Sequence, residues 1–264
     1  MGRIARALLV AAWAAAACGH GPPASTGPAD APTADAPDAP DAAAPRAVLF
    51  VGNSYTYYFD LPVEVAALAP PAAPLATTSV TVGGATLGDH WAGAAKDAIA
   101  AGGHAVVVLQ GQSQEPLLDA AGFAASADLL TGAAASAGAE VAFYQTWARR
   151  AGDPFYAVPA SGGTPAAMQD GLTAGYAAAA TRNHAAVAPV GEARRLALAE
   201  APTLELFDPD GSHPSAAGAY LAAAVLVETL TGQPPTDAPR LGLDAATRAT
   251  LRDVAHRAVR ATAP

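Results

Sequence analysis

The stretch Ala47-Val48-Leu49-Phe50-Val51-Gly52-Asn53-Ser54 decides the fold. Its five consecutive apolar residues are rich in β-branched and aromatic side chains and predict a fully buried strand that ends at Gly52. Glycine lets the chain turn sharply there, and asparagine tolerates unusual backbone dihedrals. Ser54 follows the carboxyl end of this strand, where open α/β sheets bind their ligands, although a serine in a turn is by default only a turn former.

Strands and helices alternate from Arg46 to the end of the chain. Strands are expected at 47–51, 77–82, 104–110, 140–146 and 185–190, and helices at 61–68, 86–101, 117–137, 165–182, 191–199, 214–231 and 244–260. Pro214 suits the first position of a helix. The last helix is amphipathic, and its small, alanine-rich apolar face favours packing on the core over membrane binding. Repeated strand–helix units predict an α/β domain over 46–264, with about five parallel strands between two layers of helices.

The first 18 residues read as a signal peptide. Arg3 and Arg6 precede an apolar run, 7–17, that is too short to span a bilayer. The run ends at Cys18 and resembles the lipobox of bacterial lipoproteins, with Ala15 where that motif usually has leucine. This resemblance implies lipidation of Cys18 and a membrane-anchored lipoprotein of the bacterial cell envelope. Cleavage at an ordinary A-x-A site, which would release a free protein, is the alternative; either way the chain is exported.

Residues 19–45 are rich in proline, alanine and aspartate and have little to bury, so we expect a disordered tether. With a single cysteine the chain has no internal disulfide. The net charge of −9 and the lack of a basic stripe argue against a nucleic-acid partner. We expect a monomer whose membrane contact is made only through the N-terminal lipid anchor.

A second signal lies far along the chain, in Asp208-Pro209-Asp210-Gly211-Ser212-His213-Pro214. An acid stands three residues before a histidine, so that carboxylate and imidazole can share one tight turn. A serine nucleophile needs a base, and the base needs an orienting acid. Ser54, His213 and Asp210 could supply all three, although Asp208 competes with Asp210 because both occur in turn-forming sequences.

Four blocks of the sequence together resemble those of the SGNH (GDSL-type) hydrolases. They occur in the order of that family, over residues 46–231: Gly52-Asn53-Ser54, Gly83-Gly84, Gln110-Gly111-Gln112-Ser113 and Asp210-Gly211-Ser212-His213. The resemblance implies a flavodoxin-like sandwich, esterase or deacetylase chemistry, and neither metal nor cofactor. Carried over by position, Ser54 is the nucleophile, His213 the general base and acid, and Asp210 the residue that orients the imidazole.

The resemblance also implies an oxyanion hole, and here the sequence departs from the family. The usual third block is Gly-x-Asn-Asp, but Gln112 stands at the asparagine position, with the same NH₂ donor on a longer stem. Gln110 could serve instead. The other expected donors are the backbone N–H groups of Ser54 and Gly84, with Gly83 as the alternative.

Three further residues are candidates for substrate binding. Asn53 adjoins the serine, His90 follows the glycine block, and Trp147 comes after the strand expected at 140–146. A tryptophan at that edge of the sheet could stack on a sugar or cover an acyl group, although plain packing is equally consistent. The histidines are scattered and make no metal-ligand pattern, and Gly83-Gly84 lacks the spacing of a dinucleotide site.

The sequence thus predicts a secreted serine esterase that hydrolyses carboxylic esters through an acyl-enzyme. The substrate is a small-molecule or carbohydrate ester, with acetyl groups on carbohydrate suggested by family analogy. Acyl transfer to a sugar instead of water is open. The alternative from another class is a non-catalytic, flavodoxin-like surface lipoprotein that binds glycans or a partner, its oxyanion hole spoiled by glutamine.

Overall fold

A computed structural model describes residues 43–262 of the chain. The predicted signal peptide (1–18), Cys18 and residues 19–42 of the predicted tether lie outside the described residues. Residues 43–45 are exposed and have no regular secondary structure. No helix within 43–262 is long and apolar enough to cross a membrane.

The core of the fold is a five-stranded parallel sheet. Its strands are β1 Arg46–Gly52, β2 Leu75–Thr81, β3 Val106–Leu109, β4 Glu140–Tyr144 and β5 Ala186–Ala188, in the order β2-β1-β3-β4-β5. This is the flavodoxin-like order, in which the chain leaves β1 first toward one edge and later toward the other. Ligands of such sheets bind at the carboxyl ends of the strands beside this switch point, here β1 and β3.

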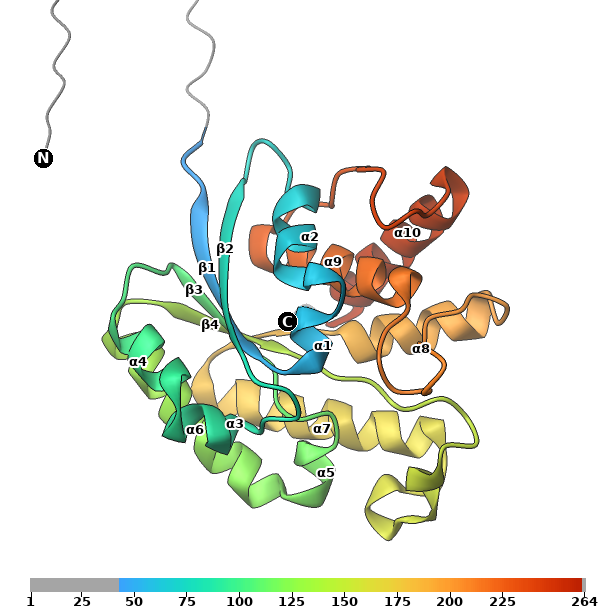
Figure 1. The fold of residues 1–264 in the computed structure, drawn as a ribbon, viewed down its shortest axis with the longest axis horizontal. Coiled ribbons are helices and arrows are strands. Elements are labelled where there is room, and N and C mark those ends of the chain that lie inside the picture. The colour runs from blue at the N-terminus through green and yellow to red at the C-terminus, as the bar shows by residue number, and fades with distance from the viewer. Residues whose placement is uncertain (1–42, 263–264) are drawn as a thin grey trace, which may run out of the picture. The chain divides into compact units, whose positions relative to one another are not determined.

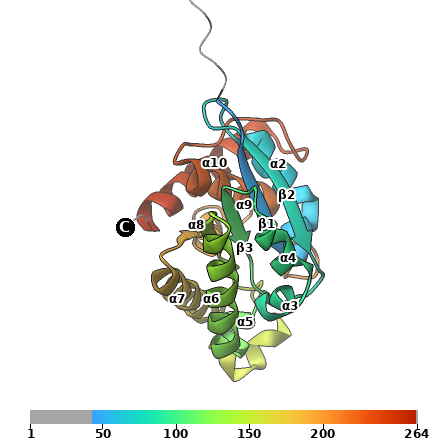
Figure 2. The ribbon, with the colours of Figure 1, turned by 90° about the vertical axis from the view of Figure 1, so that its left-hand side faces the viewer.

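The central strands are buried on both faces, as the continuous apolar runs predict. Along β1, Val48 and Phe50 face one core while Leu49 and Val51 face the other. The first core is covered by α2 Leu61–Leu68, α8 Val190–Glu200, α9 Ala216–Thr231 and α10 Ala245–Thr262. The second is covered by α3 Leu87–Ala92, α4 Ala94–Ala100, α6 Ala120–Ser136 and α7 Pro165–Asn183. Figures 1 and 2 show these two layers of helices, so the predicted three-layer α/β/α fold is confirmed.

The last helix packs on the core, as expected. Leu251, Val254, Ala255 and Ala258 of α10 are buried, and the helix lies against α8 and α9 (Figure 1). Helix α9 is buried along almost its whole length, because α2, α10 and the sheet surround it.

Two predicted helices are broken, and a third does not begin at its expected proline. The helix expected at 86–101 is broken at Gly93, whose extended backbone separates α3 from α4. The helix expected at 117–137 is divided at Asp119 into α5 Glu115–Leu118 and α6, because the Asp119 side chain caps α6 through the N–H of Gly122. Pro214 does not open a helix: Ser215 is the N-cap of α9, and Pro214 pairs with Phe207 in an isolated β-bridge.

The short elements around the site were not predicted. Ser54 begins a helix of one turn, α1 Ser54–Tyr57, which is followed by the 3₁₀ turn η1 Tyr58–Asp60. Two further 3₁₀ turns, η2 Pro154–Ala157 and η3 Pro159–Ser161, lie in the long connection between β4 and α7.

Candidate active site

Glycine and asparagine shape the turn that presents Ser54. A Cβ on Gly52 would lie 2.3 Å from Thr56 Oγ1 and 2.6 Å from Gln110 Oε1, so this position admits only glycine unless its neighbours move. Asn53 is the N-cap of α1: its Oδ1 accepts a hydrogen bond from the N–H of Tyr55 at 3.1 Å. Its Nδ2 donates to the carbonyl of Ala85 at 3.0 Å. Asn53 lines the pocket at Ser54, but its side-chain amide is already hydrogen-bonded to other groups of the protein.

The structure brings Ser54, His213 and Asp210 together. His213 Nε2 lies 2.8 Å from Ser54 Oγ, and His213 Nδ1 lies 2.5 Å from Asp210 Oδ2. Asp210 Oδ1 also accepts the backbone N–H groups of Ser212 and His213, at 2.8 and 2.9 Å, which closes the tight turn expected from the three-residue spacing. Asp210, and not Asp208, therefore contacts the imidazole; Asp208 donates its N–H to the carbonyl of His213.

The Asp210 carboxylate is held in its charged form. Its partial burial raises the pKa, but the hydrogen bonds from the His213 ring and from the N–H groups of Ser212 and His213 together outweigh that effect and lower the pKa below its usual value. A charged carboxylate can accept the Nδ1–H of His213, which leaves Nε2 of a neutral ring as the acceptor toward Ser54.

Two tyrosines from the segment after Ser54 contact the His213 ring. Tyr58 stacks on it, with ring centroids 4.4 Å apart and an interplanar angle of 14°. Tyr55 meets it edge-on at 5.6 Å, and its hydroxyl lies 2.7 Å from Ser212 Oγ. After Tyr58, Phe59 and Asp60 both adopt left-handed dihedrals, with φ of 56° and 50°. Consecutive left-handed residues other than glycine are strained, and such strain clusters at functional sites.

A pocket of about 360 Å³ lies at Ser54 and His213, and we call it the catalytic pocket. The glycine block and Gln112 also line it, so the structure brings all the expected oxyanion-hole residues to one place: Ser54, Gly83, Gly84 and Gln112. Gln112 Nε2 donates to Ser113 Oγ at 3.1 Å, and Gln112 Oε1 accepts the N–H of Gln114 at 2.7 Å. An amide NH₂ carries two N–H groups, so the second remains for a ligand.

Gln110 has a structural role next to this pocket. It is fully buried, and its Oε1 accepts the N–H of Asn53 at 2.9 Å and the hydroxyl of Thr56 at 2.8 Å. Its Nε2 donates to Asn53 Oδ1 at 3.0 Å and to the carbonyl of Gly111. These bonds tie β3 to the turn that carries Ser54 and occupy both ends of the amide.

Glu115 fixes the loop that carries Gln112. Its buried carboxylate accepts the N–H of Gln112 at 2.9 Å and, through both oxygens, the N–H of Leu87 at 3.1 Å. Burial raises the pKa of Glu115, and these hydrogen bonds oppose the rise without cancelling it. The carboxylate thereby joins the Gln112 loop to the start of α3.

Two of the three candidates for substrate binding, His90 and Trp147, do not line the catalytic pocket. His90 is buried, does not line the catalytic pocket, and places Nε2 2.9 Å from the carbonyl of Gly52. Its burial lowers its pKa, which suits a neutral ring that supports the backbone at the end of β1. Trp147 is only 1% exposed, so neither face of its ring is open to a sugar.

Trp147 belongs to a stack of rings and a guanidinium beside the site. Tyr55 stacks on it at 4.1 Å, and the Arg194 guanidinium lies 4.2 Å from the Trp147 ring and 4.5 Å from the Phe207 ring. Arg194 Nη2 donates to the carbonyl of Leu206 at 2.8 Å. Burial lowers the pKa of Arg194 to about 10, and the two aromatic faces stabilise its charge. Trp147 Nε1 donates to the carbonyl of Ser212 at 3.0 Å, which links the stack to the His213 turn.

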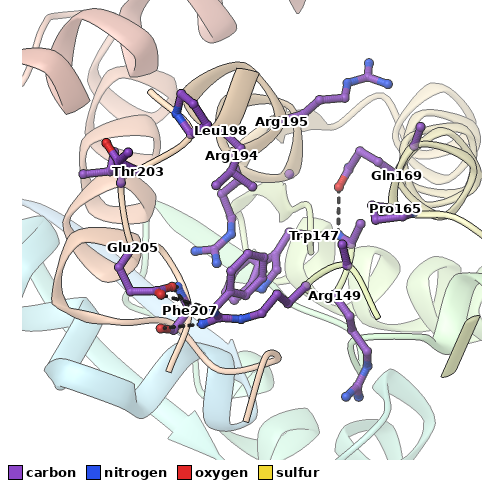
Figure 3. Close-up of a pocket in the computed structure, with 17 residues that line it drawn as sticks. Trp147, Arg149, Pro165, Gln169, Arg194, Arg195, Leu198, Thr203, Glu205 and Phe207 are labelled. Atoms are coloured by element: carbon purple, nitrogen blue, oxygen red, sulfur yellow. Dashed lines mark hydrogen bonds and ion pairs between the residues drawn. The ribbon is translucent and has the colours of Figure 1, made fainter. Parts of the chain in front are cut away.

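A second pocket of about 450 Å³, here called the side pocket, lies beyond Trp147. It is enclosed by the segment 147–151, the first turn of α7, helix α8 and the segment 202–207 (Figure 3). Arg149 lines both the side pocket and the catalytic pocket. Within 43–262, no group of three or more His, Cys, Asp or Glu side chains is arranged to hold a metal ion.

Sequence reasoning missed Tyr55, Tyr58, Arg149 and Arg194. The run of aromatic residues directly after Ser54 was the one available signal for the tyrosines. Aromatic side chains so close to an active-site turn are expected to pack against the other residues of the site. The two arginines gave no such signal, since charged residues on a helix or loop usually face solvent.

Comparisons with solved structures find similar chains. The chain is 33% identical to a protein from Slackia heliotrinireducens assigned to the SGNH hydrolases, covering 71% of this chain and 100% of that one, with a TM-score of 0.61. A DUF4886 family protein from Bacteroides uniformis is 18% identical, covering 82% of this chain and 95% of that one, with a TM-score of 0.67. Axe2, an acetylxylan esterase from Geobacillus stearothermophilus, is 15% identical, covering 70% of this chain and 94% of that one, with a TM-score of 0.55.

No family model matches the chain, and no curated protein matches it in sequence. The two likenesses below 20% identity bear on the fold alone. The similarity at 33% identity extends over the whole length of the relative. In this chain, Ser54, His213 and Asp210 are linked by hydrogen bonds at the carboxyl edge of a flavodoxin-like sheet. The chain belongs to the SGNH hydrolase family.

Proposed function

We propose that the protein is a serine esterase that hydrolyses carboxylic esters through an acyl-enzyme. The observation that carries this proposal is the chain of contacts from Ser54 Oγ to His213 Nε2 at 2.8 Å and from His213 Nδ1 to Asp210 at 2.5 Å. A neutral imidazole at that distance can accept the hydroxyl proton as the oxygen attacks, and the carboxylate stabilises the imidazolium that forms.

The positions of Ser54, His213 and the oxyanion-hole donors suggest the following steps. Ser54 Oγ forms a bond to the ester carbonyl carbon, and its proton moves to His213 Nε2. The carbonyl oxygen takes up the electron pair and is stabilised by the N–H groups of Ser54 and Gly84 and by the amide of Gln112, with Gly83 the alternative to Gly84. On collapse, His213 returns the proton to the leaving alcohol, and water repeats the sequence on the acyl-enzyme to release the acid.

Acetyl groups on carbohydrate are the proposed substrates. One solved structure with the same fold is an acetylxylan esterase, which supports this class by analogy. The lipobox-like end at Cys18 and the proline-rich segment after it support export and anchoring at the cell envelope, where acylated glycans are accessible.

Labelling of Ser54 by a fluorophosphonate tests the proposal. The full chain should form one covalent adduct on Ser54, identified by mass spectrometry of the peptide, because only a serine with a bonded base is activated. Ser54→Ala should not be labelled, whereas Ser136→Ala, which changes an exposed serine at the end of α6, should be labelled as fast as the wild type. A folded wild type that resists the reagent would favour a binding protein without turnover.

Tyr58 is expected to speed the proton transfers of His213. Its ring covers one face of the imidazole and attracts the imidazolium through a cation–π contact, which is worth about 0.5–2 kcal/mol. Tyr58→Leu should therefore lower kcat for p-nitrophenyl acetate about 3- to 30-fold with little change in KM. Tyr58→Phe, which keeps the ring, should restore kcat. A leucine variant with the kcat of the wild type would contradict this role.

A further inference from the structure

The side pocket adjoins the catalytic pocket at Arg149, which lines both. Its wall is also bonded to the turn that carries His213. Trp147 Nε1 donates to the carbonyl of Ser212 at 3.0 Å, and the N–H of Arg150 donates to the carbonyl of Gly211 at 2.9 Å. A group in the side pocket would thus lie beside the histidine turn and not beside the glycine block, which contributes no residue to it.

The proton transfer to the leaving group determines which half of an ester lies on the His213 side of the site. His213 must give its proton to the leaving oxygen, so the alcohol has to extend from the carbonyl carbon toward His213. The carbonyl oxygen points instead to Gly84 and Gln112, which line only the catalytic pocket. The alcohol half of the substrate would therefore extend toward the side of the catalytic pocket at which Arg149 and the side pocket lie.

The lining of the side pocket suits a sugar. Partly exposed apolar surface for the C–H face of a ring is offered by Pro165 and Leu198. Thr203 adds a hydroxyl that can bond to a sugar. Glu205 is paired with Arg150, and Arg195 is paired with Asp170 and Glu192, but both side chains stay partly exposed and have further bonding capacity. Figure 3 shows these side chains coming from α7, from α8 and from the segment 203–207.

We propose that the side pocket is a subsite for the alcohol half of the ester and that it takes a saccharide. This inference rests on the proposed esterase function. It assigns selectivity for the leaving group to the segment 202–207 and to the facing turns of α7 and α8, outside the four sequence blocks. The acyl group stays in the catalytic pocket.

Filling the side pocket tests the inference. Ala166 is exposed, lies in the first turn of α7 and lines the pocket, so Ala166→Trp should narrow it without disturbing the core. The matched control is Ala177→Trp, at an exposed position of α7 outside the pocket. The substrates are p-nitrophenyl acetate and two fully acetylated disaccharides, xylobiose and cellobiose, all assayed with the full-length chain.

Ala166→Trp should lower kcat/KM for the acetylated disaccharides by about tenfold or more, because binding energy from the remote part of a substrate is lost. It should change kcat/KM for p-nitrophenyl acetate much less, within about twofold of the wild type, because the single ring of p-nitrophenol is smaller than a disaccharide and has less binding energy to lose in the side pocket. Ala177→Trp should change neither. Leu198→Trp, on the facing helix, should repeat the result, and melting temperatures near that of the wild type would show that the variants are folded.

The outcomes separate this inference from the proposed function. A wild type that hydrolyses none of the esters overturns both. A wild type that cleaves p-nitrophenyl acetate but not the acetylated disaccharides, or folded tryptophan variants that keep full activity on the disaccharides, overturns only the subsite. The subsite is also overturned if Ala166→Trp instead discriminates between p-nitrophenyl acetate and p-nitrophenyl octanoate, because the pocket would then hold the acyl half.

Discussion

His213→Ala is expected to lower kcat/KM for p-nitrophenyl acetate by about 10³-fold or more, with the fold intact. The reason is geometric: without the imidazole, Ser54 Oγ loses the acceptor 2.8 Å away and the leaving alcohol loses its proton donor. The side chain is only partly buried, so its removal opens no large cavity. Near-ultraviolet circular dichroism should match the wild type.

Two comparisons make this result specific. Ser54→Ala combined with His213→Ala should be no slower than either single variant, because the members of a triad act as a unit. His104→Ala should keep full activity, since His104 precedes β3 and thus lies at the amino edge of the sheet. Losses from Ser54→Ala and His213→Ala that multiplied in the double variant would argue for two independent roles and against a triad.

Gln112→Ala is expected to lower kcat by about 10²–10³-fold, the usual loss when one donor of an oxyanion hole is removed. Gln112 lines the catalytic pocket with Ser54, and one of its two amide N–H groups is already bonded to Ser113. If the other stabilises charge that develops only in the transition state, as we propose, KM for p-nitrophenyl acetate should change little.

Gln110→Ala is the matched comparison, and it should act mainly on stability. Its buried amide bonds to Asn53, Thr56 and Gly111, so its loss leaves buried donors and acceptors without partners, at about 1–3 kcal/mol each. We expect a clear fall in melting temperature. The assignment would be reversed if Gln112→Ala kept its kcat while a folded Gln110→Ala variant lost it.

The fold could be predicted because its strongest signals are local. Continuous apolar runs such as 47–51 and 105–109 occur where a strand is covered on both faces, and β1 and β3, like β4, are interior strands so covered. The predicted helix bounds were wrong where a single side chain or a single backbone conformation sets the end of a helix. Gly93 breaks a helix through its extended backbone, and Asp119 starts a new one by capping Gly122.

The candidate site could be predicted in part for a related reason. Asp210 and His213 lie within one turn, so their spacing alone constrains their contact, whereas 159 residues separate Ser54 from His213 and only family order linked them. The environment of the site depends on contacts between distant segments. Burial of His90, Trp147 and Arg194 follows from the packing of α3, the β4–α7 connection and α8, which no local pattern encodes.

The stack around Trp147 has an optical consequence. An indole with 1% of its surface exposed emits at short wavelength, and a tyrosine ring at 4.1 Å and a guanidinium at 4.2 Å make that emission sensitive to small displacements. Its Nε1–H is bonded to the carbonyl of Ser212, so a shift of the turn that holds His213 changes the surroundings of the indole. The protein therefore carries an intrinsic fluorophore beside the turn that holds His213, and a ligand that shifts this turn is expected to change the emission of Trp147 in stopped flow without an attached dye.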